Sequence, residues 1–441
     1  MDHATSTDPA VQAQLDRLFA HGPGTDVLGL DRITRLLARL GDPHRSLPPV
    51  FHVAGTNGKG STCAFLRAAL EAAGHRVHVY TSPHLVRFNE RIRLAGKLID
   101  DAALASLLAQ VLDAAEDLNA SFFEVTTAAT FLAFARTPAD ACVVEVGLGG
   151  RLDATNVLPA PAVCGIAGLG LDHEAFLLAP EPGVPAQPLA RIAFEKAGIA
   201  KSGVPLVTLA HPRPMAAAIE AVARDRGARL YVAESEWRME AAGDRLHYCD
   251  AEGQLELPSP ALVGAHQSDN AGLAVAMLRH QQALPIPSAA IAAGLRAATW
   301  PARMQRLGPG PLCSLLASQA ELWLDGAHNP AAAAPVARTL ERIAQGRPVT
   351  LILGMLANKD AAGVLTALAP GVGHVIAVPT PGHAHHAPEA LAQIARDLGR
   401  SATTAPDLPA ALTLADTPVV LIAGSLYLAG EALRLNDELP D

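Results

Sequence analysis

The stretch that decides the fold is HVAGTNGKGST, His52–Thr62, where a glycine-rich turn joins a short apolar run to a helical pattern. Glycines let backbone amides curl around phosphate oxygens, and the N-terminus of the following helix adds a favourable dipole. The usual signature places Ser or Thr directly after the lysine, whereas here Gly60 separates Lys59 from Ser61. We predict a nucleotide phosphate loop, rather than an ordinary glycine-rich turn, in which Gly60 keeps the first helical turn open.

The segments around this loop predict a parallel α/β sheet. A strand at 49–55, a helix at 59–74 and a strand at 76–82 form one strand–loop–helix–strand unit. Further buried strands are expected at 141–147, 162–168 and 204–210, and a second set at 320–326, 348–354, 374–380 and 418–424. We therefore expect a large N-terminal phosphate-loop ATPase domain with a mostly parallel sheet (1–298) and a smaller C-terminal Rossmann-like α/β domain (299–441).

Composition excludes several classes of protein. The chain has 441 residues and a formal net charge of −9, which argues against a nucleic-acid or anionic-membrane binder, since these need a basic surface. Its five cysteines form no close pair, so reduced thiols are expected. The N-terminal residues lack the pattern of a secretory signal, and no apolar run reaches the roughly 18 residues of a membrane span. We expect a cytoplasmic, monomeric protein that binds small molecules.

Several ordered segments carry a resemblance to a known family. They are VAGTNGKGST (53–62), TSPHLVRFNERIRL (81–94), SFFEVTTAATFLAF (121–134), VVEVGLGGRLDATN (143–156), GLDHEAF (170–176), IAFEKAGIAK (192–201), GAHQSDNAGLA (264–274), WPARMQ (300–305), LDGAHNPAAA (324–333), GMLANKD (354–360) and GSLYLAGE (424–431). The chain resembles the folylpolyglutamate synthase/dihydrofolate synthase family, of the bifunctional bacterial type, within the Mur ligase superfamily. The resemblance spans both expected domains.

The resemblance implies an ATP-dependent acid–amino-acid ligase. Such an enzyme joins L-glutamate to dihydropteroate and to the γ-carboxylate of tetrahydrofolate, and it forms ADP and phosphate. A carboxylate is a poor electrophile, so transfer of the γ-phosphoryl group gives an acyl phosphate that the glutamate amine attacks. The protein mainly aligns three anionic reactants and screens their repulsion.

Matching positions in the family imply the metal ligands Ser82, Glu145 and His173, each following a strand. Carboxyl ends of parallel strands meet at one sheet edge, although an imidazole is an unusual ligand for Mg²⁺. Unrelated polar residues at strand ends are the alternative. Lys196 matches a lysine that the family carries as N6-carboxylysine, whose anion helps to hold a second metal ion; a solvated lysine paired with Glu195 is its alternative. The implied cofactors are two Mg²⁺ ions, ATP as co-substrate and a monovalent cation.

The resemblance also implies the ATP and glutamate contacts. The ATP-binding residues are Thr56, Asn57, Gly58, Lys59, Gly60, Ser61, Asn270, Arg303 and Asp325. His328 and Ser425 match positions near the incoming glutamate. The alternative for Asp325 is that it only forms the turn. The alternative for His328 is a histidine that caps a helix or has its hydrogen bonds satisfied within the turn. The predicted catalytic residues are Lys59, Lys196, Asp325 and His328.

Contacts to the folate-type substrate are expected in three segments. They comprise Asp26, Val27, Leu28, Ser121, Phe122, Phe123, Glu124, Leu152, Asp153 and Ala154. Phe122 or Phe123 could pack on a flat pterin, with core packing as the alternative. Arg87, Arg91 and Arg93 offer local cations on an acidic protein, either for an anionic substrate or as a solvated loop face.

The sequence departs from the family pattern in three places, one of which is the segment GIAGLGLDH (165–173), where a Thr-Ser pair is expected. The proline-rich insertion 177–190, between His173 and Lys196, either alters access to the metal site or bulges outward. His383, His385 and His386 stand where we expect an arginine, and an exposed loop is favoured over a metal site.

The sequence is also compatible with two alternative functions. A peptidoglycan-type Mur ligase would act on a UDP-muramyl substrate, and we expect no separate UDP-sugar domain here because the phosphate loop begins at Gly55. A regulatory phosphate-loop NTPase would need no glutamate site. The segments 81–94 and 143–156 favour the folate branch.

Overall fold

The computed structural model describes residues 4–21 and 28–441, which group into two compact units. Unit 1 comprises residues up to Pro83 together with 88–261 and 267–299. Unit 2 comprises residues 84–87, 262–266 and 300–441. The main division falls between Thr299 and Trp300, and two short segments from earlier in the chain group with unit 2.

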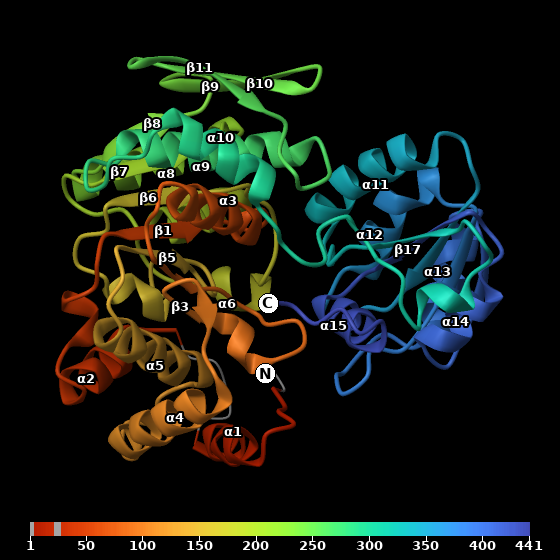
Figure 1. Cartoon of the computed structure of the whole chain (residues 1–441), viewed down its shortest axis with the longest axis horizontal. Coiled ribbons are helices and arrows are strands. Elements are labelled where there is room, and N and C mark those ends of the chain that lie inside the picture. The colour runs from red at the N-terminus through yellow and green to blue at the C-terminus, as the bar shows by residue number, and fades with distance from the viewer. Residues whose placement is uncertain (1–3, 22–27) are drawn as a thin grey trace. The chain divides into compact units, whose positions relative to one another are not determined.

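The described part of unit 1 is built on an eight-stranded sheet in the order β4-β3-β2-β5-β1-β6-β7-β8 (Figure 1). The strands are β1 (Val50–Ala54), β2 (Val77–Tyr80), β3 (Ile92–Leu94), β4 (Lys97–Leu98), β5 (Ala141–Glu145), β6 (Val163–Ile166), β7 (Pro205–Thr208) and β8 (Arg229–Val232). All are parallel except β3 and β4, which form an antiparallel edge. The predicted strands of this domain and its mostly parallel sheet are confirmed.

Helices cover both faces of this sheet. On one face, Cys142 and Val144 pack with α4 (Asp101–Ala115) and α5 (Phe122–Arg136), in a core that also takes in α1 (Pro9–His21) and α2 (Asp31–Arg39). Further along the same face, Cys164 and Leu206 pack with α7 (Pro188–Ala197) and α8 (Arg213–Arg226). Helices on both faces bury every side chain of a central parallel strand. For this reason such strands appear in the sequence as continuous apolar runs.

The other face carries α3 (Lys59–Ala72), α9 (His266–His280) and α10 (Ser288–Ala297). Gly165 of β6 lies against Met277, whose sulfur would be 2.3 Å from a Cβ at that glycine. Gly294 of α10 leaves no space for a side chain, because a Cβ there would lie 2.5 Å from the backbone of Ala69. Glycine therefore sets how closely α10 packs on α3, the helix that follows the phosphate loop.

A small antiparallel sheet follows the main one in unit 1. Its strands are β9 (Trp237–Ala242), β10 (Arg245–Asp250) and β11 (Gly253–Pro258), joined by tight turns and paired through β10. Sequence reasoning did not anticipate this sheet. Most of its side chains are exposed or half-buried, so it offers no apolar run of the kind that marked the central strands.

Unit 2 is a doubly wound α/β fold with the strand order β12-β13-β17-β14-β15-β16. Its strands are β12 (Gln305–Arg306), β13 (Glu321–Leu324), β14 (Val349–Leu353), β15 (His374–Ala377), β16 (Ser401–Thr404) and β17 (Val419–Ala423). The four strands predicted here are confirmed. Side chains alternate along β14, since Leu351 and Leu353 join one core and Ile352 joins the other.

The two cores of unit 2 lie on opposite faces of that sheet. One core contains α11 (Pro330–Ala344), α12 (Ala361–Leu368) and α13 (Pro388–Asp397), and the other contains α14 (Leu408–Leu414) and α15 (Leu426–Leu435). Leu85 and Val86 pack into the second core. A Cβ at Gly430 would lie 1.9 Å from the Leu85 carbonyl oxygen, so segment 84–87 is closely fitted to α15.

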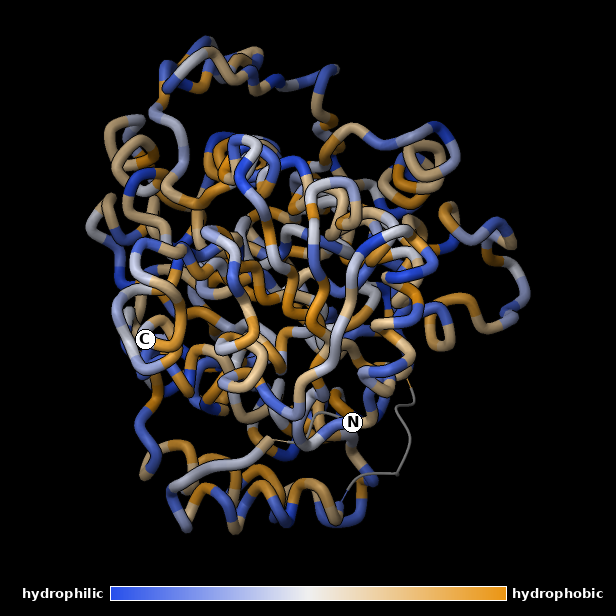
Figure 2. Tube along the Cα trace, turned by 90° about the vertical axis from the view of Figure 1, so that its right-hand side faces the viewer, coloured by the Kyte–Doolittle hydropathy of each residue, from blue (hydrophilic) through white to orange (hydrophobic). Residues whose placement is uncertain are grey.

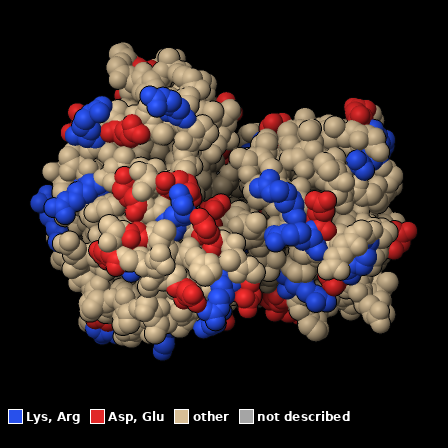
Figure 3. Space-filling model, turned by 90° about the horizontal axis from the view of Figure 1, so that it is seen from above, with Lys and Arg blue, Asp and Glu red and all other residues tan. Residues whose placement is uncertain are grey.

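Surface properties agree with the composition. Figure 2 shows helices whose trace alternates between apolar and polar residues, as expected for elements that bury one face. On the face drawn in Figure 3, the described acidic and basic side chains are interspersed and form no continuous basic stripe. Within residues 4–21 and 28–441, no helix is both long enough and apolar enough to cross a membrane.

Candidate active site

The phosphate loop lies between the end of β1 and the start of α3. Gly58 adopts a left-handed conformation, with φ of 87°, and α3 begins at Lys59 without a side-chain cap. The first intrahelical bond reaches back from the Thr62 amide to the Gly58 carbonyl, at 2.9 Å. The preceding amides of the first turn have no partner inside the helix, and such a terminus attracts anions.

The loop is fixed against the residues that follow β6. The amides of Thr56 and Asn57 both donate to the Gly168 carbonyl, at 2.8 and 3.0 Å. The Thr56 hydroxyl is 3.0 Å from the carbonyl oxygen of Gly170. Gly55 has φ of 155°, and a Cβ there would lie 2.9 Å from that of Ala167. Glycine is therefore required where the loop leaves the strand.

Two lysines converge on this loop. The Lys59 ammonium donates to the Gly55 carbonyl at 3.2 Å, and the buried Lys196 ammonium donates to the same oxygen at 2.9 Å. Lys59 also lies 3.9 Å from the Glu145 carboxylate. Burial, together with the nearby Lys59, lowers the pKa of Lys196 to about 7. The structure thus excludes the alternative of a solvated Lys196, because this side chain points into the interior.

Ser82 and Glu145 lie together at the carboxyl edge of the sheet. The Ser82 amide donates to the buried Glu145 carboxylate at 3.2 Å. Their hydroxyl and carboxylate oxygens are the donor type that Mg²⁺ and Mn²⁺ prefer, so this pair fits a divalent cation next to the phosphate loop. His173 is exposed at the start of α6 (Glu174–Leu177), with φ of 53°. In the described residues, no three His, Cys, Asp or Glu side chains are grouped as a metal site.

Asn270 of α9 lies beside the phosphate loop. Its Oδ1 would be 2.3 Å from a Cβ at Gly58, and its amide donates to Gln267 at 3.0 Å. Position 58 must therefore be glycine both for its backbone conformation and for the approach of this amide. Of the predicted ATP contacts outside the loop, Asn270 is the one that unit 1 places against it.

The segment GLGGR, Gly147–Arg151, packs on the end of α7. A Cβ at Gly150 would lie 2.8 Å from the Glu195 carbonyl oxygen and 2.9 Å from that of Lys196. The Arg151 amide donates to the Glu195 carbonyl at 2.7 Å. This glycine loop and Lys196 consequently form one packed unit.

Asp153 points inward rather than into an open site. Its carboxylate accepts from the amides of Leu148 and Thr155, and it lies 2.5 Å from the Thr155 hydroxyl. That hydroxyl also contacts His52 Nε2 of β1 at 2.9 Å. Burial raises the pKa of the Asp153 carboxyl and lowers that of the His52 imidazole to about 3. This buried network holds the predicted substrate segment Leu152–Ala154 on the sheet.

The second predicted substrate segment begins α5 with a capping box. The Ser121 side chain accepts from the Glu124 amide, and the Glu124 carboxylate accepts from the Ser121 amide at 2.7 Å. Arg32 of α2 pairs with Glu124 at 2.9 Å, a contact that sequence reasoning missed because the two residues are far apart in the chain. Asp26 and Val27 lie outside the described residues, and Leu28 is half-buried.

Both phenylalanines of this segment are half-buried and already have aromatic neighbours. Phe123 stacks on Tyr80 at 5.9 Å between ring centroids, and its ring would be 2.3 Å from a Cβ at Gly147. Phe122 stacks on Phe19 at 5.6 Å. The guanidinium of Arg91 lies 5.5 Å from the Phe122 ring centre. Arg91 is only 1% exposed, so the alternative of a solvated loop face is wrong for this residue.

Unit 2 places its predicted residues at the carboxyl ends of β13 and β17. The buried Asp325 carboxylate accepts from the amides of Met304 and Ala327, both at 2.8 Å. Burial raises the pKa of this carboxyl, and the Arg303 guanidinium opposes that shift. Arg303 Nη1 would lie 2.8 Å from a Cβ at Gly326, so the turn after β13 brings Asp325 and Arg303 into one neighbourhood.

His328 and Ser425 occupy the same edge of that sheet. His328 Nδ1 lies 2.8 Å from the Gly326 carbonyl oxygen, which ties the ring to the turn after β13. Ser425 caps α15, and its hydroxyl accepts from the Tyr427 amide at 3.1 Å. The amide of Gly424 donates to Ala327 at 3.0 Å and so links the two segments. Ligands bind at such edges in open α/β folds.

Comparison with known proteins shows the family to which the chain belongs. Residues 312–426 match the family model described as Mur ligase, glutamate ligase domain. The chain is 37% identical over 339 residues to the dihydrofolate synthase/folylpolyglutamate synthase of Escherichia coli K12. The alignment covers 77% of this chain and 74% of that relative. The chain belongs to the folylpolyglutamate synthase/dihydrofolate synthase family.

Solved structures of the folylpolyglutamate synthase/dihydrofolate synthase family share the whole fold. The E. coli FolC complex with DHPP and ADP superposes with a TM-score of 0.85 at 32% identity and covers 98% of this chain and 99% of that one. A bifunctional synthase solved with Mn, AMPPNP and L-glutamate bound gives 0.81 at 33% identity, with the same coverage. A relative from Halobacterium salinarum is 35% identical to this chain. The chain spans about half of that protein's length (51%).

The histidine cluster of this folylpolyglutamate synthase/dihydrofolate synthase family member is built into its loop. His385 Nδ1 lies 2.7 Å from the His383 carbonyl oxygen, and His386 Nε2 lies 2.9 Å from that of Lys359. The His383 ring stacks on Tyr427 at 3.8 Å between centroids. The three side chains are half-buried rather than exposed as expected, and their rings make separate contacts, which favours a structural loop over a metal site.

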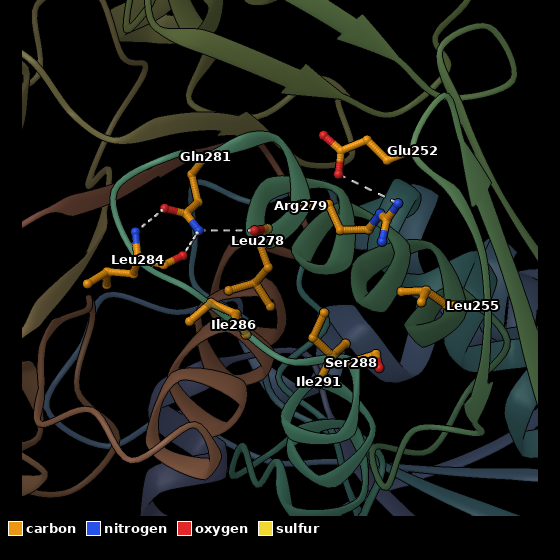
Figure 4. A pocket seen from close by; sticks show the side chains of 9 residues that line it. All are labelled: Glu252, Leu255, Leu278, Arg279, Gln281, Leu284, Ile286, Ser288 and Ile291. Carbon is orange, nitrogen blue, oxygen red and sulfur yellow. Dashed lines mark hydrogen bonds and ion pairs between the residues drawn. The ribbon is translucent and has the colours of Figure 1, made fainter.

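A pocket of unit 1 lies between α9, α10 and the small sheet, and none of the predicted site residues lines it (Figure 4). Its polar groups are engaged in holding the fold. Gln281 donates to the carbonyls of Leu278 and Leu284, and Arg279 pairs with Asp250 at 2.6 Å and with Glu252 at 3.7 Å. We read this pocket as packing around loop 281–287.

Proposed function

We propose that the protein is an ATP-dependent ligase that joins L-glutamate to dihydropteroate and to the γ-carboxylate of tetrahydrofolate through an acyl phosphate. The observation that carries this proposal is the convergence of Lys59, Lys196 and Glu145 on the uncapped start of α3. Such a site binds a polyphosphate beside a divalent cation. Membership of the family supplies the class of acceptor and of amine.

In unit 1, the phosphate loop receives ATP. The amides of the loop and of the first turn of α3 hold the phosphate oxygens, and Lys59 neutralises charge on them. These contacts involve Thr56, Asn57, Gly58, Lys59, Gly60 and Ser61, with Asn270 beside them. Gly60 is buried inside α3, so no side chain at that position hinders the approach of the substrate carboxylate.

Ser82, Glu145 and His173 are the residues proposed to hold Mg²⁺. A bound divalent cation screens the charge of the phosphoryl group during its transfer. We further propose a second ion and a carbamate on Lys196, which forms when the neutral amine attacks CO₂ and releases a proton. A Lys196 pKa of about 7 supports this step, since an ordinary lysine is almost fully protonated at that pH. A monovalent cation remains a prediction of the resemblance.

Residues at the edge of unit 2 are proposed to bind the remaining groups. Arg303 and Asp325 contact ATP, and Ser425 and His328 receive glutamate. His328 is proposed to orient the amine or a carboxylate of glutamate, and its contact with the Gly326 carbonyl oxygen fixes the ring in the turn after β13.

The folate-side contacts are proposed at Ser121–Glu124 and Leu152–Ala154. Asp153 acts there by positioning the segment, since its carboxylate is bonded to the backbone. The predicted contacts at Asp26–Leu28, a monomeric state and a cytoplasmic location also stay predictions.

A phosphate-release assay with single omissions tests the function. With dihydropteroate, ATP and L-glutamate present, we expect ADP, phosphate and dihydrofolate in equal amounts. Omission of dihydropteroate should stop phosphate release, whereas continued turnover without an acceptor would indicate an NTPase. A strict requirement for a UDP-muramyl acceptor would indicate the peptidoglycan branch. Tetrahydrofolate as acceptor separately tests the second activity.

A further inference from the structure

The proline-rich insertion 177–190 connects two parts of the site. It begins at the end of α6, whose first residue follows His173, and it ends at α7, which carries Lys196. Glu181 is the single charged side chain of the insertion. A loop of this composition would ordinarily bulge into solvent, so its attachments to the rest of unit 1 decide whether it has a role.

Glu181 ties the insertion to two arginines outside it. Its carboxylate accepts from Arg151 at 3.0 and 2.5 Å in a forked geometry, and from Arg191 at 2.9 Å. Arg151 belongs to the glycine loop and Arg191 to α7. An isolated exposed ion pair contributes little to stability. A forked arginine–carboxylate pair within a network, by contrast, fixes the relative positions of the segments that it joins. The Arg191 side chain is 6% exposed and that of Arg151 19%, so both guanidinium groups are largely fixed by packing.

Apolar and backbone contacts hold the start of the insertion. Leu177 is buried, and its Cδ2 would be 2.9 Å from a Cβ at Gly149, which has φ of 71°. Arg191 Nε donates to the Leu177 carbonyl at 3.1 Å. Leu177 and Glu181 are therefore held on the glycine loop and α7, whereas most residues from Ala179 to Gln187 are exposed.

The same arginines reach the residue next to Lys196. Arg151 donates to the Glu195 carboxylate at 3.1 and 3.0 Å, and Arg191 lies 3.0 Å from it. Glu195 is 3% exposed on its side chain. Two arginines and two glutamates thus form a quartet without net charge, in which the insertion supplies one of the two carboxylates.

We propose that Glu181 is a positioning residue for the ligase reaction: it holds the insertion on the glycine loop and, through Arg151 and Glu195, fixes that loop against the turn of α7 that carries Lys196. This inference deepens the proposed function and rests on it for the effect on turnover. Its structural part stands on the contacts of the quartet. Without the Glu181 carboxylate, two guanidinium groups share only Glu195, and the quartet keeps one uncompensated positive charge.

The test compares Glu181→Gln with Glu256→Gln. The control makes the same chemical change in an exposed pair, since Glu256 bonds Arg245 at 2.7 Å across the small sheet. Hydrogen exchange of the full chain without substrates is measured for segments 147–156 and 174–197. We expect faster exchange in both segments for E181Q, unchanged exchange in the central strands, and a wild-type pattern for E256Q.

Steady-state kinetics supply the second readout. Because displacement of a positioned group by about 1 Å can cost up to 10²-fold in rate, we expect kcat of E181Q to fall about tenfold. The KM for ATP should stay within about twofold, since the Gly55–Gly58 loop is bonded to Gly168 and Gly170 instead. Glu181→Asp, which keeps the charge on a shorter side chain, should recover part of kcat and replaces E181Q should that variant not fold.

Wild-type exchange in both segments of E181Q would overturn the inference, as would a wild-type kcat. Faster exchange throughout unit 1 would also overturn it, because that result indicates general destabilisation. If the wild-type protein shows no ligase activity while E181Q loosens only the two segments, the proposed function fails and the structural coupling stands.

Discussion

Lys59 and Lys196 donate to the same backbone oxygen, that of Gly55, at 3.2 and 2.9 Å. Two cations that share one acceptor in a buried place disfavour each other's charge. Burial, and then the nearby charge of Lys59, lower the pKa of Lys196 to about 7. The start of the phosphate loop thus couples the phosphate-binding cation to a lysine that is half neutral near pH 7.

A dependence on CO₂ follows from this pair. We expect enzyme prepared in CO₂-free buffer at pH 8 to lose most of its ligase activity and to regain it when bicarbonate is added. The response should weaken as the pH falls below about 7, because the protonated amine does not attack CO₂. Lys196→Met should show no bicarbonate response at any pH. An unmodified enzyme that is fully active in CO₂-free buffer would contradict the carbamate.

Replacement of the loop lysine should abolish turnover. We expect Lys59→Ala to reduce amide formation by about 10³-fold, since it removes a charge aimed at the transferred phosphoryl group. The Lys59 side chain is only half-buried, so the circular dichroism spectrum and the melting temperature should stay close to those of the wild type. A ligase rate near that of the wild type would mean that the phosphate loop is wrongly assigned.

Acid should destabilise unit 1 through His52. The pKa of this imidazole is about 3 in the folded protein and about 6.5 when unfolded, so the unfolded state binds the extra proton in between. Its contribution to stability is therefore complete above about pH 6.5 and is lost progressively as the pH falls towards 3. His52→Gln, which does not titrate, should show a shallower fall in melting temperature between pH 6.5 and pH 4. Parallel curves for the two proteins would contradict this assignment.

Gly150 should tolerate no side chain. A methyl group there meets the carbonyl oxygens of Glu195 and Lys196, which belong to the backbone and cannot rotate away. We expect Gly150→Ala to lower the free energy of unfolding by about 1–3 kcal/mol and to reduce kcat as well. Gly371→Ala is the matched control, because no atom lies within 4 Å of a Cβ at that position. Chemical denaturation of both variants measures the difference.

Sequence patterns were sufficient for the parts of the fold where burial on both faces leaves continuous apolar runs. Strands such as Val50–Ala54 and Val419–Ala423 are apolar along nearly their whole length, and both were predicted. The sheet of β9, β10 and β11 was missed because most of its side chains are exposed or half-buried, so its strands contain no continuous apolar run. The glycines at 243 and 253, both with positive φ, were the available turn signals.

The site could be predicted by residue type but not by orientation. The pattern around Lys59 indicated a phosphate loop, yet nothing local showed that Lys196 would reach Gly55, 141 positions away. Likewise, Asp153 looks like a substrate contact in the sequence, although its carboxylate turns to the backbone. Long-range pairs such as Arg32 with Glu124 arise from packing between helices, and one sequence carries no signal for them.

The assignment of residues 84–87 and 262–266 to unit 2 has a consequence for how the protein can be made and dissected. The chain enters that unit and leaves it again twice before its main part is synthesised. A fragment beginning at Trp300 would lack Leu85 and Val86, whose side chains complete one of its cores, and the Arg87 donor to the Pro440 carbonyl. The two units are therefore not modules that a single cut separates, and an experiment on either half must carry the interleaved segments with it.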